Sequence, residues 1–312
     1  MNSYAPIALF TYSRADHTKA AVESLLHNKE AAESDLFIFS DGPKREGIRK
    51  AVEDNRRYIH TVTGFKSVHI VEREDNWGLA NSLIAGITEV INRYGKVIVV
   101  EDDLILSPFF LQYMNDALEK YKDEDQIGAI TAYCPIVDRK LPETFFLRYF
   151  HCWGWATWKR GWDLMNLDTK YLLRKIRWKT KKFNLDGGIN NYGMLYCQKV
   201  GLVDSWFIRL YASFFLAEKL TLFPGHSLVS NHGLDGSGTH SKNKSGTGND
   251  GVGISVLNTP IELRDIPIQE NNRTYKLISD SLIALHPQSG LLKQNYGRFK
   301  SFVRRLLYID CA

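Results

Sequence analysis

Three consecutive carboxylates, Glu101, Asp102 and Asp103, are the residues whose types and spacing suggest chemistry most directly. Adjacent carboxylates repel one another and resist removal from water, so solvent, hydrogen-bond donors or a cation must offset their charge. A hard divalent cation such as Mg²⁺ or Mn²⁺ needs one or two carboxylates, with phosphate oxygens and water completing its shell. The triplet is therefore either part of a metal site or a solvated acidic turn.

The residues on both sides of the triplet indicate a strand that is buried on both faces of a sheet. Residues 97–100 (VIVV) are β-branched and apolar, and the apolar run resumes at 104–106 (LIL). Ser107 and Pro108 then suggest the N-cap and first turn of a helix that reaches about Tyr121. Ligands of open α/β sheets bind beyond the carboxyl ends of the strands, where the triplet would lie. This position makes a metal site as well supported as a solvated turn.

Strands and helices alternate along the first part of the chain. The predicted strands are 6–12, 35–40, 67–71, 97–100 and 127–133, and the predicted helices are 17–27, a segment ending near 59, 79–93 and 107–121. This alternation predicts an α/β fold with a doubly wound, mostly parallel sheet. Asp41 begins the Asp-Gly-Pro turn after the second strand, and Asn76 lies in the loop after the third.

The composition changes after these elements. Residues 145–162 are dense in aromatic residues. Four tryptophans, at 153, 155, 158 and 162, fall within ten residues. They could pack into a corner of the core, or one or two rings could form a wall on which a sugar ring stacks. Further on, Asp204 and Ser205 precede an apolar helix predicted at 207–220, and capping alone would explain either residue.

The composition is that of an ordinary globular chain. Its 312 residues are 44% hydrophobic and 24% charged, without an apolar run of membrane-spanning length or a signal peptide. Four cysteines are scattered without Cys-x-x-Cys pairing, so neither a zinc site nor a disulfide framework is indicated. We therefore expect a cytoplasmic protein.

The net charge of +5 is concentrated in two segments, 170–182 and 291–309. The second also places apolar residues at helical spacing, which predicts a basic amphipathic helix that binds an anionic membrane surface or docks on the protein itself. Between the two segments, 234–253 is rich in glycine and predicts a flexible loop. No nucleic-acid partner is expected, because the rest of the chain is close to neutral and no recognised nucleic-acid-binding module is present.

From about residue 6 to residue 233, the chain resembles GT-A fold glycosyltransferases, most closely the N-acetylglucosaminyltransferase I family and its bacterial relatives. The Glu-Asp-Asp-Leu motif of that family is matched identically at 101–104. The resemblance implies that Asp103 is the direct ligand of Mn²⁺ or Mg²⁺, and that Glu101 and Asp102 orient the ribose and the donor sugar. It also implies nucleotide contacts for Arg14, after the first strand, and for Asp41, while Asn76 resembles a nucleotide-proximal segment of the broader inverting family.

Three later matches imply the acceptor side of such a site. Trp155 lies in a Gly-Trp segment of the family, and Asp204 and Trp206 match an Asp-x-Trp whose aspartate is the catalytic base. Trp155 and Trp206 are therefore expected at the substrate. Val229 and Ser230 match a segment that contacts the diphosphate ahead of a flexible lid.

The resemblance implies an inverting, metal-dependent enzyme that moves a sugar, with N-acetylglucosamine expected, from a UDP-sugar to a saccharide acceptor. Vertebrate members carry a disulfide beside the nucleotide, and Tyr12 and Gly42 at the corresponding positions imply a bacterial type. The acceptor would then be linked to a lipid diphosphate, for O-antigen, capsule or similar glycan at the inner face of the cytoplasmic membrane.

The same resemblance suggests a division of the chain into three parts. Residues 1–233 would form the GT-A domain, with a nucleotide-sugar half to about 106 and an acceptor half at 107–233. The loop at 234–253 and a C-terminal helical extension at 254–312 would follow. Two other functions stay open: a sugar nucleotidyltransferase, although no glycine-rich phosphate-binding segment follows the first strand, and a non-catalytic glycan-binding protein, which would leave the triplet unexplained.

Overall fold

The computed structural model describes residues 4–135, 141–233 and 256–285. The strands are β1 (Ile7–Thr11), β2 (Asp35–Ser40), β3 (Ser67–Glu72), β4 (Lys96–Glu101), β5 (Leu104–Leu106), β6 (Ile127–Thr131), β7 (Thr144–Leu147), β8 (Trp155–Trp158), β9 (Leu220–Pro224) and β10 (Val229–Asn231). The helices are α1 (Ala15–Leu26), α2 (Glu46–Ile59), α3 (Leu79–Tyr94), α4 (Phe110–Lys120), α5 (Lys159–Trp162), α6 (Thr169–Ile176), α7 (Thr180–Phe183), α8 (Asn191–Lys199), α9 (Trp206–Leu216) and α10 (Asn272–Leu285), with 3₁₀ turns η1 (Lys29–Glu33) and η2 (Leu185–Gly187). The predicted glycine-rich loop and the predicted basic helix at 291–309 lie outside the described residues.

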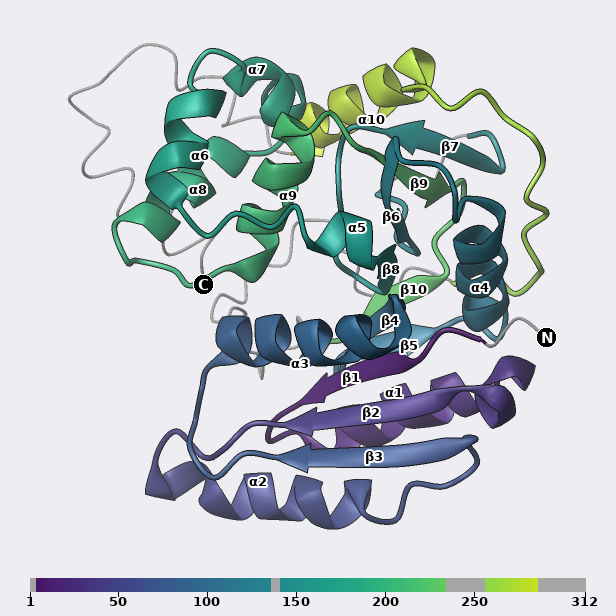
Figure 1. Ribbon diagram of the computed structural model, residues 1–312, viewed down its shortest axis with the longest axis vertical. Coiled ribbons are helices and arrows are strands. Elements are labelled where there is room, and N and C mark those ends of the chain that lie inside the picture. Colours follow the sequence, from purple (N-terminus) through teal and green to yellow (C-terminus); the bar gives the residue numbers. More distant parts are fainter. Residues whose placement is uncertain (1–3, 136–140, 234–255, 286–312) are drawn as a thin grey trace.

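One eight-stranded sheet runs through the molecule in the order β3-β2-β1-β4-β8-β6-β9-β7 (Figure 1). The first four strands of this order are parallel to one another, and β6 is parallel to β9. β8 is antiparallel to both of its neighbours, and β7 is antiparallel to β9. The predicted α/β fold with a mostly parallel sheet is therefore confirmed.

Helices cover both faces of this sheet because alternate side chains of each strand point to opposite sides. Ala8 and Phe10 of β1 pack in one apolar cluster with residues of α3 and α9, whereas Ile7 and Leu9 pack in the other with residues of α1 and α4. The central strand β4 divides its side chains in the same way, and residues 97–100 are all buried. This confirms the prediction of a strand covered on both faces.

The structure corrects two predicted helix ends. The helix after the triplet begins at Phe110, and its N-cap is Phe109 rather than Ser107. Ser107 is buried, and its hydroxyl donates to the Leu257 carbonyl (2.5 Å) and accepts from the Phe109 N–H (3.1 Å). The helix after Asp204 ends at Leu216, because Glu218 takes a left-handed conformation (φ 55°) that turns the chain into β9.

The C-terminal extension, where it is described, returns to the body of the molecule (Figure 1). The Asn271 N–H donates to the Phe146 carbonyl (2.8 Å), and the Ser279 hydroxyl on α10 donates to the Leu185 carbonyl (2.7 Å). Within the described ranges, no helix combines the length and the apolar composition needed to cross a bilayer. The division into three parts stays a prediction.

We predict that Gly161→Ala destabilises the fold. Gly161 on α5 packs against Gly128 of β6 and Thr157 of β8. A Cβ at Gly161 would lie 2.4 Å from the Gly128 carbonyl oxygen and 2.5 Å from the Thr157 hydroxyl. Overpacking of this kind should lower the free energy of unfolding by roughly 1–3 kcal/mol in urea denaturation. Gly47→Ala on α2 is the control, because a Cβ there meets nothing within 4 Å, and it should stabilise by about 0.4–1 kcal/mol. Equal effects of the two substitutions would contradict this account of the packing.

Candidate active site

The acidic triplet lies at the carboxyl end of β4, where Glu101 pairs with Phe10 at the end of β1. Asp102 is buried, and Glu101 and Asp103 are half-buried. Arg14 follows β1 and reaches across to the triplet, so that its Nη2 donates to Asp102 Oδ1 (2.5 Å) and to Asp103 Oδ2 (3.0 Å). The structure therefore brings together the four residues that the sequence predicts there.

Three carboxylates face one guanidinium in this cluster, and their pKa values reflect the imbalance. Burial raises the pKa of Glu101 to about 8, and the charges of Asp103 and Asp102 add to the effect. Burial also raises the pKa of Asp102 to about 6, although Arg14 opposes the increase. For Arg14, burial favours a lower pKa, but the two paired carboxylates outweigh it and the pKa is raised. The raised pKa values show that the protein does not supply enough positive charge to keep all three carboxyl groups ionised, so Glu101 is largely protonated near neutral pH.

These residues fit a divalent cation that is only partly enclosed by protein. Among the described residues, no group of three or more His, Cys, Asp or Glu side chains is arranged to hold a metal ion by itself. Carboxylate oxygens are nevertheless the ligands that Mg²⁺ and Mn²⁺ prefer, and Mg²⁺ in phosphate-binding sites keeps water and substrate oxygens in its shell. Asp103 is suited to this task, because its side chain is 20% exposed against 8% for Asp102.

The short strand β10 lies beside the triplet through its antiparallel pairing with β5, which sets Ser230 opposite Ile105. Val229 and Ser230 are both buried in this pairing. His232 was not predicted from the sequence, yet its N–H donates to the Asp103 carbonyl (2.8 Å) and its exposed ring lies 3.1 Å from the Ser230 hydroxyl. Its position two residues after Ser230, on the same side of an extended segment, is the signal that could have found it.

Gly233 packs directly against Asp103. A Cβ at Gly233 would lie 2.2 Å from Asp103 Oδ2, which is closer than a side chain can approach. A larger residue at position 233 would therefore force the Asp103 carboxylate to move.

Asp41, at the end of β2, holds the loop before α3 in place. One carboxylate oxygen accepts from the N–H groups of Gly42 (3.0 Å) and Trp77 (2.9 Å), and the other accepts from Asn76 Nδ2 (3.0 Å) and the Gly78 N–H (2.9 Å). All four bonds come from the protein. A nucleotide that contacts Asp41 would add a fifth hydrogen bond to the carboxylate or replace one of these four. The nucleotide contact of Asp41 therefore stays a prediction.

The Asp41 loop and the triplet lie at the same edge of the sheet, separated by β1. The Asp41 N–H donates to the Thr11 carbonyl (3.4 Å), and the backbone of Tyr12 hydrogen-bonds to Asp102. The loop also carries Trp77, which is 49% exposed and whose ring lies 4.2 Å from the Arg73 guanidinium. Arg73 and Trp77 were not singled out from the sequence.

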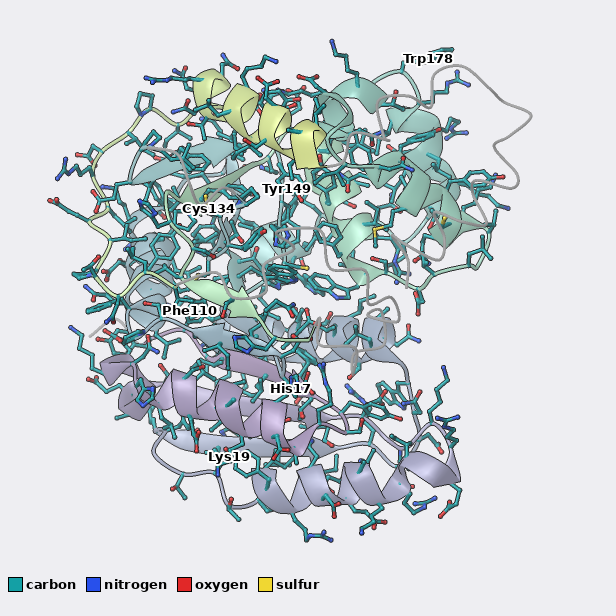
Figure 2. The ribbon with its side chains drawn as sticks, turned by 180° about the vertical axis from the view of Figure 1, so that it is seen from behind. His17, Lys19, Phe110, Cys134, Tyr149 and Trp178 are labelled. Atoms are coloured by element: carbon teal, nitrogen blue, oxygen red, sulfur yellow. The ribbon has the colours of Figure 1, made fainter. Side chains whose placement is uncertain are left out.

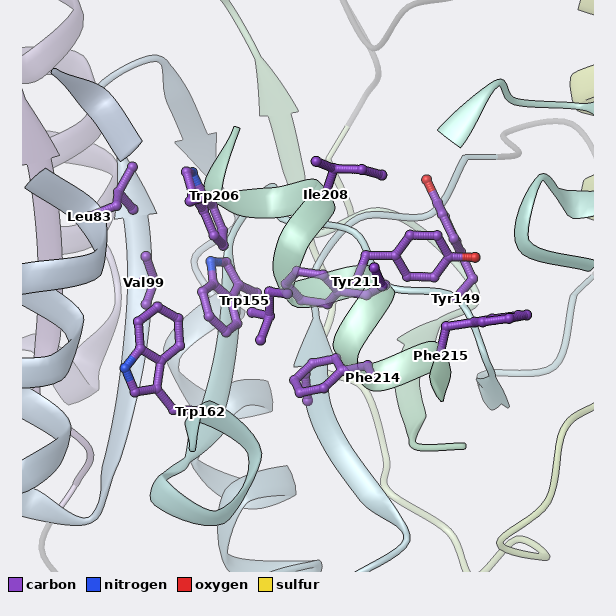
Figure 3. Packing of buried hydrophobic residues seen from close by; sticks show 14 of the residues in the cluster. Leu83, Val99, Tyr149, Trp155, Trp162, Trp206, Ile208, Tyr211, Phe214 and Phe215 are labelled. Atoms are coloured by element: carbon purple, nitrogen blue, oxygen red, sulfur yellow. The ribbon is translucent and has the colours of Figure 1, made fainter. Parts of the chain in front are cut away.

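The structure corrects the expectation that Trp155 and Trp206 contact the substrate. Trp155 is fully buried and Trp206 is 3% exposed, and their rings stack with centroids 5.4 Å apart (Figure 3). Neither ring offers an open face for a sugar, so packing into the core is the interpretation that holds for both. Trp155 pairs with Val99, two residues before Glu101. The stack therefore anchors the beginning of α9 close to the carboxyl end of β4.

Asp204 lies two residues before Trp206, at the beginning of α9. Ser205 rather than Asp204 caps the helix, since its hydroxyl accepts from the Ile208 N–H (3.3 Å). Asp204 is 55% exposed, and its Oδ1 accepts from Nη2 of the largely buried Arg209 (3.0 Å). A carboxylate oriented by a second group, with one oxygen open to solvent, has the arrangement of a general base. Arg209 was not singled out from the sequence.

The chain is similar to known proteins in sequence and in structure. The model of glycosyl transferase family 2 matches residues 7–188, whereas no curated protein matched the chain. A mannosyltransferase from Pyrobaculum calidifontis, solved in complex with GDP-Man and Mn²⁺, is similar with a TM-score of 0.38 and 12% identity over 68% of this chain and 69% of that one. TarS from S. aureus is similar with a TM-score of 0.29 and 16% identity over 44% of this chain and 23% of that one.

The two structural likenesses are too distant to carry an argument about substrates. The family match is different, because it extends over more than half of the chain and includes β1 to β4, Arg14, Asp41 and the whole triplet. The chain belongs to glycosyl transferase family 2 and is a glycosyltransferase with a GT-A fold.

Proposed function

We propose that this enzyme is an inverting, metal-dependent glycosyltransferase that transfers a sugar, with N-acetylglucosamine expected, from a UDP-sugar to a saccharide acceptor. The observation that carries the proposal is the triplet 101–103 at the carboxyl end of β4, with Arg14 as its only paired cation among the described residues. A Mn²⁺ or Mg²⁺ ion would offset the remaining charge. The choice of donor rests on the resemblance of the Glu-Asp-Asp-Leu motif at 101–104 to that of the N-acetylglucosaminyltransferase I family, and this resemblance is part of the proposal.

The donor diphosphate would lie beside the paired side chains of Arg14 and Asp103. Asp103 would hold the cation, while Glu101 and Asp102 would face the ribose and the donor sugar. A divalent cation bound there acts as a Lewis acid toward the phosphate oxygens and favours departure of the nucleotide. Arg14 has a further role, because its Nη1 is buried and has no hydrogen-bond partner among the described residues. This nitrogen can donate to a phosphate oxygen of the donor.

Four residues around this centre complete the proposed donor site. Asp41 and Asn76 would contact the base and ribose. This is consistent with their position, because a single strand, β1, separates the end of β2 from the triplet on β4. Val229 and Ser230 would contact the diphosphate, mainly through the backbone, because both side chains are buried in the β10–β5 pairing.

Asp204 would act as the general base on the acceptor side. Arg209 engages Oδ1 and leaves Oδ2 to accept the proton of the acceptor hydroxyl. The acceptor oxygen then attacks the anomeric carbon while the bond from that carbon to the phosphate oxygen breaks on the opposite face. The nucleotide diphosphate leaves, and the configuration at the anomeric carbon is inverted.

The setting of the reaction is also a proposal. The acceptor would be linked to a lipid diphosphate in the synthesis of a bacterial surface glycan, and the enzyme would work at the inner face of the cytoplasmic membrane. The basic helix predicted at 291–309 was expected to contact that membrane, but it lies outside the described residues. Residues 1–233 would supply both the donor and the acceptor halves of the site.

We predict that Asp103→Ala removes metal binding in the presence of nucleotide. Loss of a residue that only hydrogen-bonds to a metal ligand lowers metal affinity by up to about 100-fold. Because Asp103 is the proposed direct ligand, the affinity for Mn²⁺ with UDP present should fall by more than roughly 100-fold. Electron paramagnetic resonance of free Mn²⁺ measures this. Asp123→Ala is the control, because Asp123 is an exposed carboxylate on the turn after α4. Unchanged Mn²⁺ affinity in the Asp103 variant would refute the ligand assignment.

Asp204→Asn is expected to remove proton acceptance while keeping the side chain's shape. Turnover, followed as release of UDP from UDP-N-acetylglucosamine with a panel of saccharide acceptors, should fall by about 10²–10⁴-fold. Binding of UDP should stay at the wild-type level, since Asp204 lies on the acceptor side. Asp163→Asn, an exposed aspartate that pairs with Lys159, should leave both quantities unchanged. Near-full turnover by the Asp204 variant would show that the base lies elsewhere.

A further inference from the structure

The helical part of the molecule formed by α6, α7 and α8 exposes an unusual amount of apolar surface. Nine large hydrophobic side chains are exposed among the described residues, and six of them lie in this one segment of the chain. The six are Leu167, Tyr171, Trp178, Tyr196, Val200 and Leu202. Trp178 is 84% exposed, the highest fraction among them, and lies at the outer edge of the molecule (Figure 2). Apolar surface gathered in this way commonly marks a contact site.

Exposed cations surround the same rings. Lys170, Arg174, Lys175, Arg177, Lys179 and Lys181 are all exposed, and none forms an ion pair with a carboxylate of the described residues. Lys182, the next cation along, is the exception and pairs with Glu270 (2.7 Å). We call the residues Tyr171, Arg174, Lys175, Arg177, Trp178, Lys179 and Lys181 the α6–α7 surface. Its cations are uncompensated, so it attracts an anionic partner.

The cations and the aromatic rings of the α6–α7 surface are arranged together. The Arg177 guanidinium lies 4.9 Å from the Trp178 ring, and Arg174 and Lys175 lie 5.8 Å and 5.7 Å from the Tyr171 ring. Each exposed aromatic ring therefore has a cation beside it. Amphipathic aromatic rings and long cationic side chains are the two kinds of residue that settle at the boundary between lipid headgroups and acyl chains.

A pocket lies at one end of this surface. It has a volume of about 370 Å³, and Trp178, Lys179 and Lys181 line it together with Lys182 and Arg148. Asp186 and Glu218 line it as well, and Arg148 pairs with Glu218 (3.5 Å) while Lys182 pairs with Glu270 (2.7 Å). Lys179 and Lys181 are the lining cations without such a pair among the described residues, and they could contact an anionic headgroup.

We propose that the α6–α7 surface docks the enzyme on an anionic lipid bilayer, with Trp178 entering the headgroup region and the surrounding cations contacting lipid phosphates. The aliphatic exposure next to this surface favours a bilayer over a nucleic acid, because Leu167, two residues before α6, gains nothing from a phosphate backbone but would be stabilised by partial burial at the lipid boundary. The cations add electrostatic attraction to the same surface.

Docking here would also orient the acceptor side of the enzyme. α6 packs against both α8 and α9, and Asp204 lies in the segment of the chain that joins these two helices. A membrane on the α6–α7 surface would therefore lie against the same helical unit that carries the proposed base. This orientation rests on the proposed function, whereas the docking itself does not depend on any turnover.

The test is flotation of the full chain with phosphatidylcholine vesicles that contain or lack about one third phosphatidylglycerol, a composition chosen for the surface potential of anionic membranes. We expect binding to the anionic vesicles only. The variant Arg174→Gln/Lys175→Gln/Lys179→Gln removes three cations and should weaken partitioning by about 100-fold. Trp178→Ala should weaken it by roughly tenfold through lost apolar burial. The matched control, Lys44→Gln/Arg45→Gln/Lys50→Gln, removes three exposed cations near and on α2 and should have little effect.

A second variant separates this surface from the basic C-terminal segment. Lys293, Arg298, Lys300, Arg304 and Arg305 are changed to Gln in an otherwise full chain, and binding through the α6–α7 surface should persist. Loss of flotation only in this second variant, or equal loss in the α2 control, would overturn the proposal. Binding of a DNA or RNA duplex that the α6–α7 variant loses, without vesicle binding, would overturn it in favour of a nucleic-acid partner. Vesicle binding in a chain that does not bind UDP would leave the docking intact and refute the proposed donor.

Discussion

The negative charge at the carboxyl end of β4 is the constraint on which the rest of this structure depends. Glu101, Asp102 and Asp103 follow the buried residues of this strand, and one guanidinium, that of Arg14, is paired with the two aspartates. Such a cluster is costly to remove from water unless further positive charge arrives. The adjacency of β1 and β4 in the sheet supplies the arginine, and the proposed cation and diphosphate would bind beyond the carboxyl ends of these strands.

Buried packing also sets the position of residues on the acceptor side of the proposed site. The stack of Trp155 on Trp206 joins β8, the neighbour of β4, to the start of α9, and therefore fixes where Asp204 lies relative to the triplet. Arg209 then orients the Asp204 carboxylate. The two tryptophans are buried, and they matter for the proposed chemistry because they position other residues. The same helical unit carries the basic and aromatic surface that faces outward on α6 and α7.

Local patterns in the sequence predicted much of this arrangement. A run of four β-branched residues before the triplet identified the central strand, and the alternation of strands and helices predicted the sheet, because both depend on neighbours in the chain. The roles that needed long-range contacts were missed. Trp155 and Trp206 were expected at the substrate because they match family motifs, and a motif match does not show which way a ring points; both rings are buried. Only the pairing of β10 with β5 shows that His232 lies beside Asp103.

Calorimetric titration of the full chain with UDP, GDP and CMP, each with and without Mn²⁺, tests the central claim most directly. The account predicts binding of UDP with Mn²⁺ and a loss of at least about tenfold in affinity without it, since the triplet needs the cation to accept a diphosphate. GDP and CMP should bind more weakly. Equal binding of UDP in the presence and absence of Mn²⁺, or no binding of any nucleotide, would contradict the claim that the triplet and Arg14 form a metal-dependent nucleotide site.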